Sequence, residues 1–397
     1  MKICILTPAY LPHRGGVEIV TFHIAKELSI LGHEVHIVTI HEITKNDKTF
    51  FSDSTPTKIT FYVHRIRLPF NATINYNQTI KSVLFIVSTF FLVRKIRPNI
   101  IHAQNIMPSI PAYLSKVFFK IPYAICVHAE KISLTGWGMI LPLFLKKYWP
   151  SFPYIKQSDV IFTLTDDSRL EIQKCLNKQS ITIPNGVDLN LFKPTQLKAI
   201  SNSNNLNIVC ISRLEKGKGI ECALHAMRSI VKQYPYSKLT IIGDGRIRKE
   251  LENLTKILEI EKNVEFVGDV PNSDVLIYLS SATIYLLTSF REGFSISLLE
   301  AMAVGLPIIS TPVGIAPNVC KEWNNGYLVP IRDPQAIYEA VMRITENSKI
   351  KLVFSKNSVD KVQEYSWSKI IKQYEREYYK ILGCDLKNNG SDFRYRT

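Results

Sequence analysis

Short apolar runs alternate with stretches of helical periodicity along most of the 397-residue chain. The first run, at 3–7, is followed by an amphipathic stretch at 17–31 and a second apolar run at 34–40, which is the order strand, helix, strand. Similar short runs, flanked by Pro, Asn or Gly, follow at 100–103, 123–128, 160–164 and 180–183. Strands that alternate with helices in this way predict a parallel sheet covered by helices.

A polar stretch after Pro194, containing 201–205, interrupts this rhythm and predicts a linker. Beyond it, strands are expected at 207–212, 239–242, 264–267, 284–287, 307–310 and 326–329. The pattern predicts two doubly wound α/β domains, at 1–193 and 206–364, that face each other across a cleft. Ligands bind such sheets at the carboxyl ends of the strands, so we expect the site there. A helix at 365–383 is expected to return to the N-terminal domain, and 384–397 form a polar tail.

The composition is that of a folded protein, with 46% hydrophobic and 21% charged residues and a mean hydropathy of +0.03. Seven cysteines without a C-x-x-C pair argue against a disulfide framework and a zinc site. The first apolar run is too short for a signal peptide. The longest uncharged apolar stretch, 83–93, is much shorter than the roughly 20 residues that span a bilayer. We therefore expect a cytoplasmic protein.

Basic residues exceed acidic residues, 49 against 34, and the excess is concentrated in one region. Between Ser54 and Ser158 there are thirteen Lys or Arg residues and a single acid, Glu130. This indicates either an ordinary solvated basic face or a surface for an anionic partner. A nucleic-acid partner is not expected, because no aromatic-basic module accompanies the charge.

The segment 134–149 mixes apolar and aromatic residues with paired lysines. That composition is typical of an interfacial helix or loop, although a helix packed inside the first domain would read in the same way. Together with the basic excess, the segment favours peripheral attachment to an anionic membrane leaflet.

Two groups of residues are placed where phosphates bind. Gly15 and Gly16 open the first expected helix, where bare backbone N–H groups can approach a phosphate, although a tight turn would use the same residues. Because a third glycine at dinucleotide spacing is missing, NAD is not expected. Arg213 and Lys218 follow the strand at 207–212 and suit a diphosphate clamp, or else are two solvated loop cations.

The segment 291–307 reads as strand, turn, helix and turn. Ser295 is expected to cap the helix and Gly305 to end it, so that the turn at 292–295 points free N–H groups at an expected phosphate. Glu300 lies inside this apolar helix, where an unpaired carboxylate would be costly. It therefore requires a partner, either a pair of sugar hydroxyls or a basic side chain.

Glu292 and Glu300 are separated by seven residues within the phrase Glu-Gly-Phe…Leu-Leu-Glu-Ala-Met-Ala. This phrase resembles the signature of the retaining glycosyltransferases of family 4, group 1. Further landmarks of that family occur in the expected order at 184–188, 212–219, 243–245 and 365–367. The resemblance covers nearly the whole chain. It implies the GT-B architecture, with two Rossmann-like domains, an acceptor domain at 1–193 and a nucleotide-sugar donor domain at 206–364.

The resemblance also implies roles for individual residues. Arg213 and Lys218 would hold the donor diphosphate, and Glu300 the nucleotide ribose. The other inherited assignments are His128 and Glu292 as catalytic residues at the donor sugar, Gly293, Phe294 and Ser295 around sugar and phosphate, Gly15 and Gly16 over the phosphates, and Phe266 and Val267 at the base. Read without the family, His128 could also be a strand-end histidine bonded to a backbone carbonyl.

This chain departs from the family at two positions: Ala129-Glu130 follow the histidine, and Arg246 stands where Pro is usual. The donor sugar therefore stays unassigned, and Glu130 reads equally as an acceptor base or an ion-pair partner.

The resemblance implies transfer with retention at the anomeric carbon and without a metal or cofactor. There is no D-x-D metal motif between the domains, so cations and a helix N-terminus would neutralise the leaving diphosphate. The expected partners are a UDP- or GDP-linked sugar and a glycan or glycolipid acceptor at the inner membrane face. The alternatives are a soluble transferase that makes a small or storage glycoside, and a non-catalytic GT-B binding protein.

Overall fold

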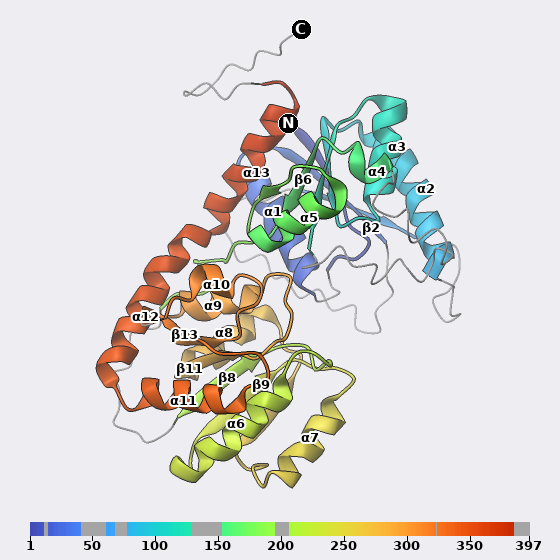
Figure 1. The fold of residues 1–397 in the computed structure, drawn as a ribbon. Helices are drawn as coiled ribbons and strands as arrows, with labels where there is room; N and C mark the ends of the chain where they lie inside the picture. The colour runs from blue at the N-terminus through green and yellow to red at the C-terminus, as the bar shows by residue number, and fades with distance from the viewer. Residues whose placement is uncertain are drawn as a thin grey trace. The chain divides into compact units, whose positions relative to one another are not determined.

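The computed structural model describes residues 1–11, 15–40, 61–67, 78–128, 153–194, 206–322 and 324–384. The chain forms two compact α/β units (Figure 1). Unit 1 comprises Met1–Asn185 together with Trp367–Thr397, and unit 2 comprises Gly186–Ser366. The first division falls after Asn185, before the expected end of the N-terminal domain at 193, and the C-terminal helix belongs to unit 1.

Unit 1 is built on a seven-stranded sheet with the order β3-β2-β1-β4-β5-β6-β7, in which each pair is parallel. Its elements are β1 (Lys2–Leu6), α1 (Gly16–Ile30), β2 (Glu34–Ile40), β3 (Tyr62–Ile66), α2 (Gln78–Ile96), β4 (Ile100–Gln104), α3 (Ser109–Phe119), β5 (Tyr123–Val127), α4 (Pro153–Lys156), β6 (Val160–Thr163), α5 (Asp166–Leu176), β7 (Ile181–Thr182) and α13 (Trp367–Ile381). The described strands were expected from the sequence except β3, an edge strand whose residues are at most half-buried.

Unit 2 contains a six-stranded parallel sheet with the order β10-β9-β8-β11-β12-β13. Its elements are β8 (Asn207–Ile211), α6 (Ile220–Gln233), β9 (Lys238–Ile242), α7 (Arg248–Ile257), β10 (Val264–Gly268), α8 (Asn272–Ser281), β11 (Ile284–Leu287), α9 (Ile296–Ala303), β12 (Ile308–Ser310), α10 (Ala316–Val319), β13 (Gly326–Leu328), α11 (Pro334–Thr345), α12 (Ser348–Val362) and η2 (Gln363–Tyr365). In each sheet the strand order reverses beside the first strand of the unit, β1 in unit 1 and β8 in unit 2, as in other doubly wound sheets.

Each sheet buries apolar side chains on both faces, which explains why its strands read as short continuous apolar runs. In unit 2 the larger core cluster joins the sheet to α6, α7 and α11. In unit 1 a core cluster joins the sheet to α2, α3 and α5.

Helix α13 belongs to unit 1 because its buried face is apolar and aromatic, with Trp367, Ile370 and Tyr374 among its buried residues. Trp367 stacks on His23 of α1 at a ring distance of 5.2 Å, and α13 runs beside α1 (Figure 1). Glu375 accepts a hydrogen bond from His33, with 2.8 Å between the oxygen and the ring nitrogen. These contacts tie the end of the chain to its beginning.

No helix in the described ranges is long and apolar enough to cross a membrane.

Candidate active site

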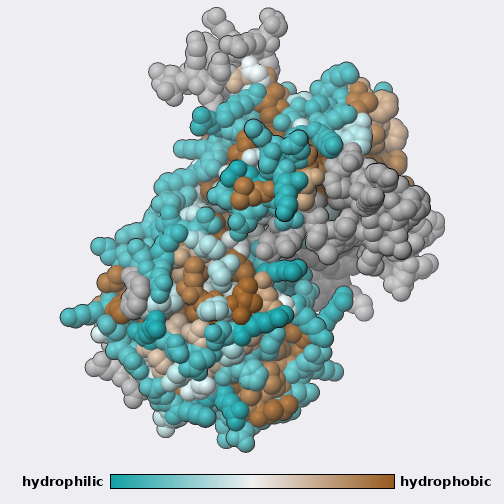
Figure 2. All heavy atoms as spheres, in the orientation of Figure 1, coloured by the Kyte–Doolittle hydropathy of each residue, from teal (hydrophilic) through white to brown (hydrophobic). Residues whose placement is uncertain are grey.

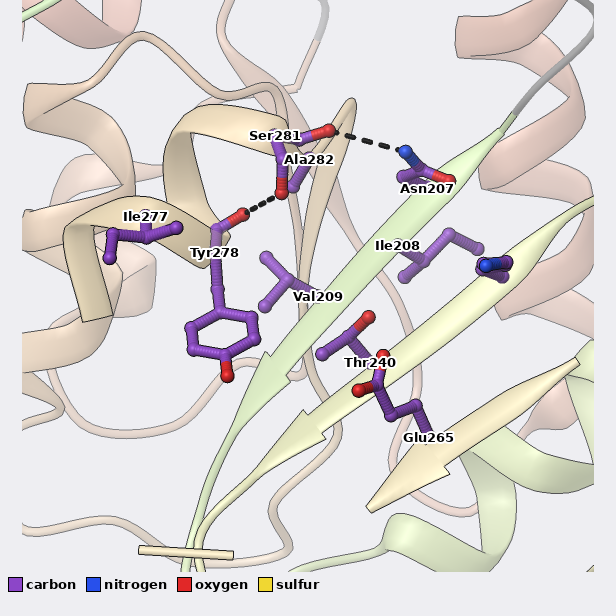
Figure 3. A pocket seen from close by; sticks show the side chains of 10 residues that line it. Asn207, Ile208, Val209, Thr240, Glu265, Ile277, Tyr278, Ser281 and Ala282 are labelled. Carbon is purple, nitrogen blue, oxygen red and sulfur yellow. Dashed lines mark hydrogen bonds between the residues drawn. The ribbon is translucent and has the colours of Figure 1, made fainter. Parts of the chain in front are cut away.

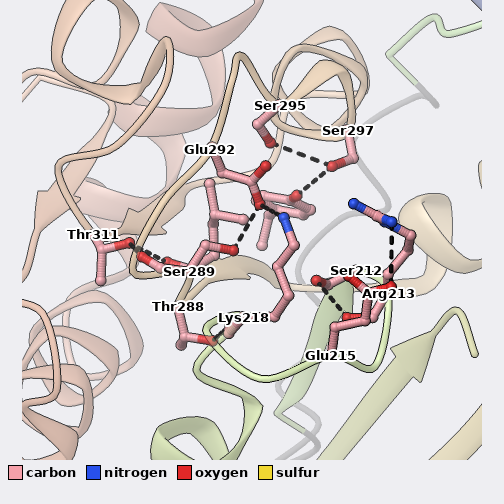
Figure 4. A network of polar contacts seen from close by, with 12 residues as sticks. Ser212, Arg213, Glu215, Lys218, Thr288, Ser289, Glu292, Ser295, Ser297 and Thr311 are labelled. Atoms are coloured by element: carbon pink, nitrogen blue, oxygen red, sulfur yellow. Dashed lines mark hydrogen bonds and ion pairs between the residues drawn. The ribbon is translucent and has the colours of Figure 1, made fainter. Parts of the chain in front are cut away.

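Two loops meet at the carboxyl ends of β8 and β11 in unit 2 (Figure 4). The backbone N–H of Phe290 donates to the carbonyl of Gly217 over 2.8 Å, and the hydroxyl of Thr288 donates to the carbonyl of Lys218 over 3.1 Å. Segment 212–219 is therefore fastened to segment 288–292. The doubly wound sheet predicts a ligand site at this edge.

The central contact of this region is an ion pair between Lys218 and Glu292 (Figure 4). The Lys218 ammonium donates to the Glu292 carboxylate over 2.7 Å, and each side chain is 16% exposed. The buried Ser289 hydroxyl donates to the same carboxylate oxygen, also over 2.7 Å. Lys218 is thus not the solvated loop cation that was one reading of the sequence.

The second expected cation, Arg213, lies differently. Its side chain is 72% exposed, and it contacts Glu215 of the same loop over 3.3 Å. An exposed pair of this kind contributes little to stability, so the guanidinium is available to a ligand at little cost.

Helix α9 begins after Ser295, but the serine side chain does not cap it. The prediction of a side-chain cap was wrong, because Ser295 adopts a left-handed backbone with φ of +79° and its hydroxyl instead lies 3.4 Å from that of Ser297. The Ser297 hydroxyl in turn lies 2.8 Å from the hydroxyl of buried Tyr285. The first turn of α9 therefore keeps backbone N–H groups that no Ser295 side chain satisfies.

Glu300 is buried inside α9, with 6% of its surface exposed. Burial raises the pKa of its carboxyl to about 7, and a hydrogen bond with the side chain of Asn272, at the start of α8, acts in the opposite direction. The protein partner anticipated from the sequence is therefore an amide and not a basic side chain. A carboxyl with this pKa changes its charge near neutral pH.

The residues expected at the base, Phe266 and Val267, lie at the end of β10, where the pairing with β9 shifts in register. The Phe266 side chain packs against the core cluster, and its carbonyl accepts a hydrogen bond from Arg248 over 3.0 Å. The Phe266 ring thus contributes to the core, and the expectation that these residues receive a base stays a prediction.

Three glycine positions allow the strand-end loops of unit 2 to approach one another. Gly219 has φ of +66°, and a Cβ there would overlap the carbonyl oxygen of Thr288. Cβ atoms at Gly243 and Gly245 would likewise overlap the carbonyls of Ser212 and Leu214. The loop that holds Lys218 is thus packed against backbone on both sides.

We expect Gly219→Ala to destabilise unit 2 by about 3 kcal/mol or more, since it combines a left-handed backbone with an overlap against rigid backbone. Gly217→Ala is the matched control, because Gly217 also has positive φ, +93°, yet nothing lies within 4 Å of its Cβ position. That change should cost about 1 kcal/mol. Urea unfolding followed by circular dichroism measures both, and equal losses would contradict the crowding argument.

Unit 1 contains the three remaining candidates. His128 follows β5, and its ring lies within hydrogen-bonding distance of the side-chain oxygen of Gln104. The alternative interpretation of the sequence expected a backbone carbonyl as the partner of this ring, and the partner is a side-chain amide instead. Desolvation lowers the pKa of His128 to about 4, so the ring is neutral at pH 7.

Gly15 precedes α1 with extended backbone, and a Cβ there would overlap the carboxylate of buried Glu18, whereas Gly16 faces open space. Gly15 therefore makes room for Glu18.

A cavity of about 250 Å³ in unit 2 is separate from these residues (Figure 3). Its lining includes Asn207, Lys238 and Tyr278. Asn207 and Lys238 are the first residues of β8 and β9, so the cavity lies at the amino ends of these strands, opposite the edge where doubly wound sheets bind ligands.

Sequence reasoning missed Ser289, Thr288 and Asn272 because polar residues in loops are common. Their positions directly after β11 and at the start of α8 were the available signal. The segment 134–149 and Glu130 lie outside the described residues. In the described ranges, no group of three or more His, Cys, Asp or Glu side chains is arranged to hold a metal ion.

Two family matches cover the two halves of the chain. Residues 14–191 match the family described as Glycosyltransferase Family 4, and residues 194–361 match Glycosyl transferases group 1. The chain therefore belongs to the family 4, group 1 glycosyltransferases. Its two parallel α/β units are the Rossmann-like domains of the GT-B fold.

The N-acetyl-alpha-D-glucosaminyl L-malate synthase of Bacillus anthracis is 27% identical over 97% of this chain and 99% of that protein. The alpha-monoglucosyldiacylglycerol synthase of Acholeplasma laidlawii is 24% identical over 98% of this chain and 98% of its own length. Among solved structures, Anabaena Alr3699/HepE in complex with UDP and glucose aligns with a TM-score of 0.73 and 17% identity, covering 95% of this chain and 99% of that one.

Proposed function

We propose that this glycosyltransferase moves a sugar from a nucleoside diphosphate to a hydroxyl acceptor with retention at the anomeric carbon and without a metal. The observation that supports the donor site most directly is the Lys218–Glu292 pair at the carboxyl edge of the unit 2 sheet. It combines a cation for a diphosphate with a carboxylate for sugar hydroxyls. The UDP and glucose bound by the structural neighbour agree with a nucleotide-sugar donor.

In this proposal each residue has a defined task. Lys218 and exposed Arg213 neutralise the diphosphate, assisted by the N–H groups of Gly293, Phe294 and Ser295 before α9. Glu292 accepts hydrogen bonds from the donor sugar, and Glu300 accepts them from the ribose. The family assignments of Gly15 and Gly16 to the phosphates, of His128 to the donor sugar and of Val267 to the base are kept as part of the proposal.

The transfer breaks the bond between the anomeric carbon and the diphosphate oxygen. The acceptor oxygen forms the new bond on the same face, and its proton passes to the departing diphosphate. Cations aimed at the developing negative charge lower the barrier by several kcal/mol, on the order of 3 per donor.

For the acceptor we propose a lipid-linked or membrane-surface glycan, with the enzyme attached peripherally to the cytoplasmic face of a membrane. The name of the Acholeplasma relative includes diacylglycerol, which supports a lipid acceptor. A soluble small acceptor is the second candidate, because the name of the Bacillus relative includes L-malate. Transfer of radiolabelled sugar into a chloroform extract, against transfer into the aqueous phase, separates the two.

Calorimetric titration with UDP, GDP and ADP tests the donor site. We expect one nucleotide to bind the wild type and to lose its binding in the Arg213→Ala, Lys218→Ala double variant. Binding of none, or binding that the double variant leaves unchanged, would reject the proposed donor site while leaving the fold intact.

A further inference from the structure

Helix α2 exposes an apolar stripe to solvent. Val83, Val87 and Phe91 are 53%, 49% and 59% exposed, and their spacing of four residues places them on one face of the helix. The opposite face is buried, with Phe85 at 0% and Val93 at 0% exposed. A surface helix normally turns polar residues to solvent, so an apolar outer face requires an explanation.

Helix α3 extends this stripe into a patch. Phe118 is 67% exposed and Val117 is 43% exposed. Phe90 of α2 joins the two helices, with its ring 5.7 Å from that of Phe118 and stacked on Phe119 at 5.0 Å. Figure 2 shows brown and tan atoms gathered along the edge of unit 1 where Figure 1 places α2 and α3. We call Val83, Val87, Phe91, Val117 and Phe118 the α2–α3 patch.

Basic side chains border the α2–α3 patch. Arg94, Lys95 and Arg97 at the end of α2 and Lys120 at the end of α3 are exposed, and the Arg94 guanidinium lies 6.0 Å from the centre of the Phe119 ring. Lys116 is different, since it pairs with Asp159 over 2.6 Å. The sequence from 54 to 129 contains no Asp or Glu that could offset this border. The patch is therefore apolar at its centre and positive at its edge.

We propose that the α2–α3 patch is the surface by which unit 1 docks on an anionic membrane leaflet. A leaflet accepts apolar side chains at the boundary of its acyl chains and offers phosphates to the bases around them, which matches both properties of the patch. Single exposed apolar residues are ordinary, but a contiguous patch bordered by one sign of charge indicates an interaction surface. The inference rests on the proposed function, in which the enzyme is attached peripherally to a membrane, and it assigns that attachment to particular residues.

Vesicle sedimentation tests this with the full-length protein and without donor or acceptor. We expect co-sedimentation with vesicles of phosphatidylcholine and phosphatidylglycerol, and much less with phosphatidylcholine alone. Val87→Ser combined with Phe91→Ser should lower the partition about tenfold, because it removes exposed apolar surface and leaves the charge unchanged. The matched control is Ile257→Ser combined with Tyr236→Ser, which removes side chains 75% and 77% exposed in unit 2.

A second pair of variants tests the charge. Arg94→Gln with Lys120→Gln should abolish the preference for phosphatidylglycerol, whereas Lys232→Gln with Lys249→Gln, which are exposed in unit 2, should not. Equal sedimentation of wild type and patch variants would overturn the proposal. So would a dimer, seen by gel filtration with light scattering, that the Val87→Ser, Phe91→Ser variant dissolves, since the patch would then join two copies of the chain.

Nucleotide calorimetry on the same variants separates the two proposals. Patch variants that lose vesicle binding but keep nucleotide binding have an intact fold and support docking. A wild type that sediments with anionic vesicles yet binds no nucleotide would remove the proposed donor site and leave the docking surface.

Discussion

Replacing Lys218 with alanine is expected to lower turnover of the nucleotide sugar by roughly 10²- to 10³-fold, the loss seen when one preorganised donor at a developing charge is removed. Lys218 is 16% exposed and lies 2.7 Å from Glu292, so its ammonium is held by the fold before any donor arrives. A preorganised cation needs little rearrangement during the reaction, which is why its loss should be severe.

Lys216→Ala is the control for this prediction. Lys216 lies in the same loop, but its side chain is exposed, so the control removes one positive charge without touching the Glu292 pair. The variants are compared by hydrolysis of sugars linked to the nucleotide that calorimetry identifies, measured at saturating concentration of the sugar that the wild type hydrolyses. Turnover of Lys218→Ala within about threefold of Lys216→Ala would contradict the assigned role, since a merely long-range charge effect would move both equally.

The ion pair also gives a reason for both residues to be present. Without a ligand, the partly buried charges of Lys218 and Glu292 compensate each other, and the Ser289 hydroxyl donates a further hydrogen bond to the carboxylate. In the proposed function Lys218 keeps this position and donates another of its three N–H groups to the diphosphate, while the second Glu292 oxygen accepts from the sugar. Ser289→Ala should therefore weaken sugar recognition more than binding of the nucleotide alone.

The alternating apolar runs predicted the described strands well, because strands buried on both faces need continuous apolar segments. The sequence YVHRI of β3 lacks that pattern, since an edge strand buries little, and so it was not expected. The amphipathic period of α13 predicted a helix with one buried face, but the period alone does not say which unit that face contacts. The missing side-chain cap at Ser295 was not accessible, because composition does not reveal a left-handed backbone.

For the candidate site too, the sequence predicted some features and could not predict others. The sequence placed Glu292 in the turn before one helix and Glu300 inside that helix, and the order of strand and loop placed Lys218 at the same sheet edge. The pairing of Lys218 with Glu292 joins residues 74 positions apart, and it depends on how closely two loops approach at Gly219. The contact of Glu300 with Asn272 likewise depends on where the first residue of α8 lies relative to α9. Such contacts follow from packing, which a single sequence does not display.

Glu300→Gln is expected to change the pH dependence of nucleotide binding and of stability in opposite senses. The Glu300 pKa is raised to about 7 by burial, above the ordinary 4.5. The folded protein thus binds the proton more tightly than the unfolded chain, so the stability that this group contributes is full below about pH 4.5 and is lost as pH rises to about 7. Relative to the wild type, the glutamine variant should therefore gain in unfolding free energy between about pH 5 and about pH 8.

Nucleotide binding should respond in the other direction, because ribose hydroxyls donate to an ionised carboxylate. As pH rises from about 6 to about 8, the affinity of the wild type relative to Glu300→Gln should increase by up to about tenfold. The ratio of the two affinities cancels the titration of the nucleotide phosphate itself. Inorganic pyrophosphate, which has no ribose, should bind both proteins equally, and Glu250→Gln, at an exposed acid of unit 2, should match the wild type throughout. A wild-type-to-variant ratio that stays flat with pH would show that Glu300 does not receive the ribose, even if nucleotide binding and the Lys218 effect are both observed.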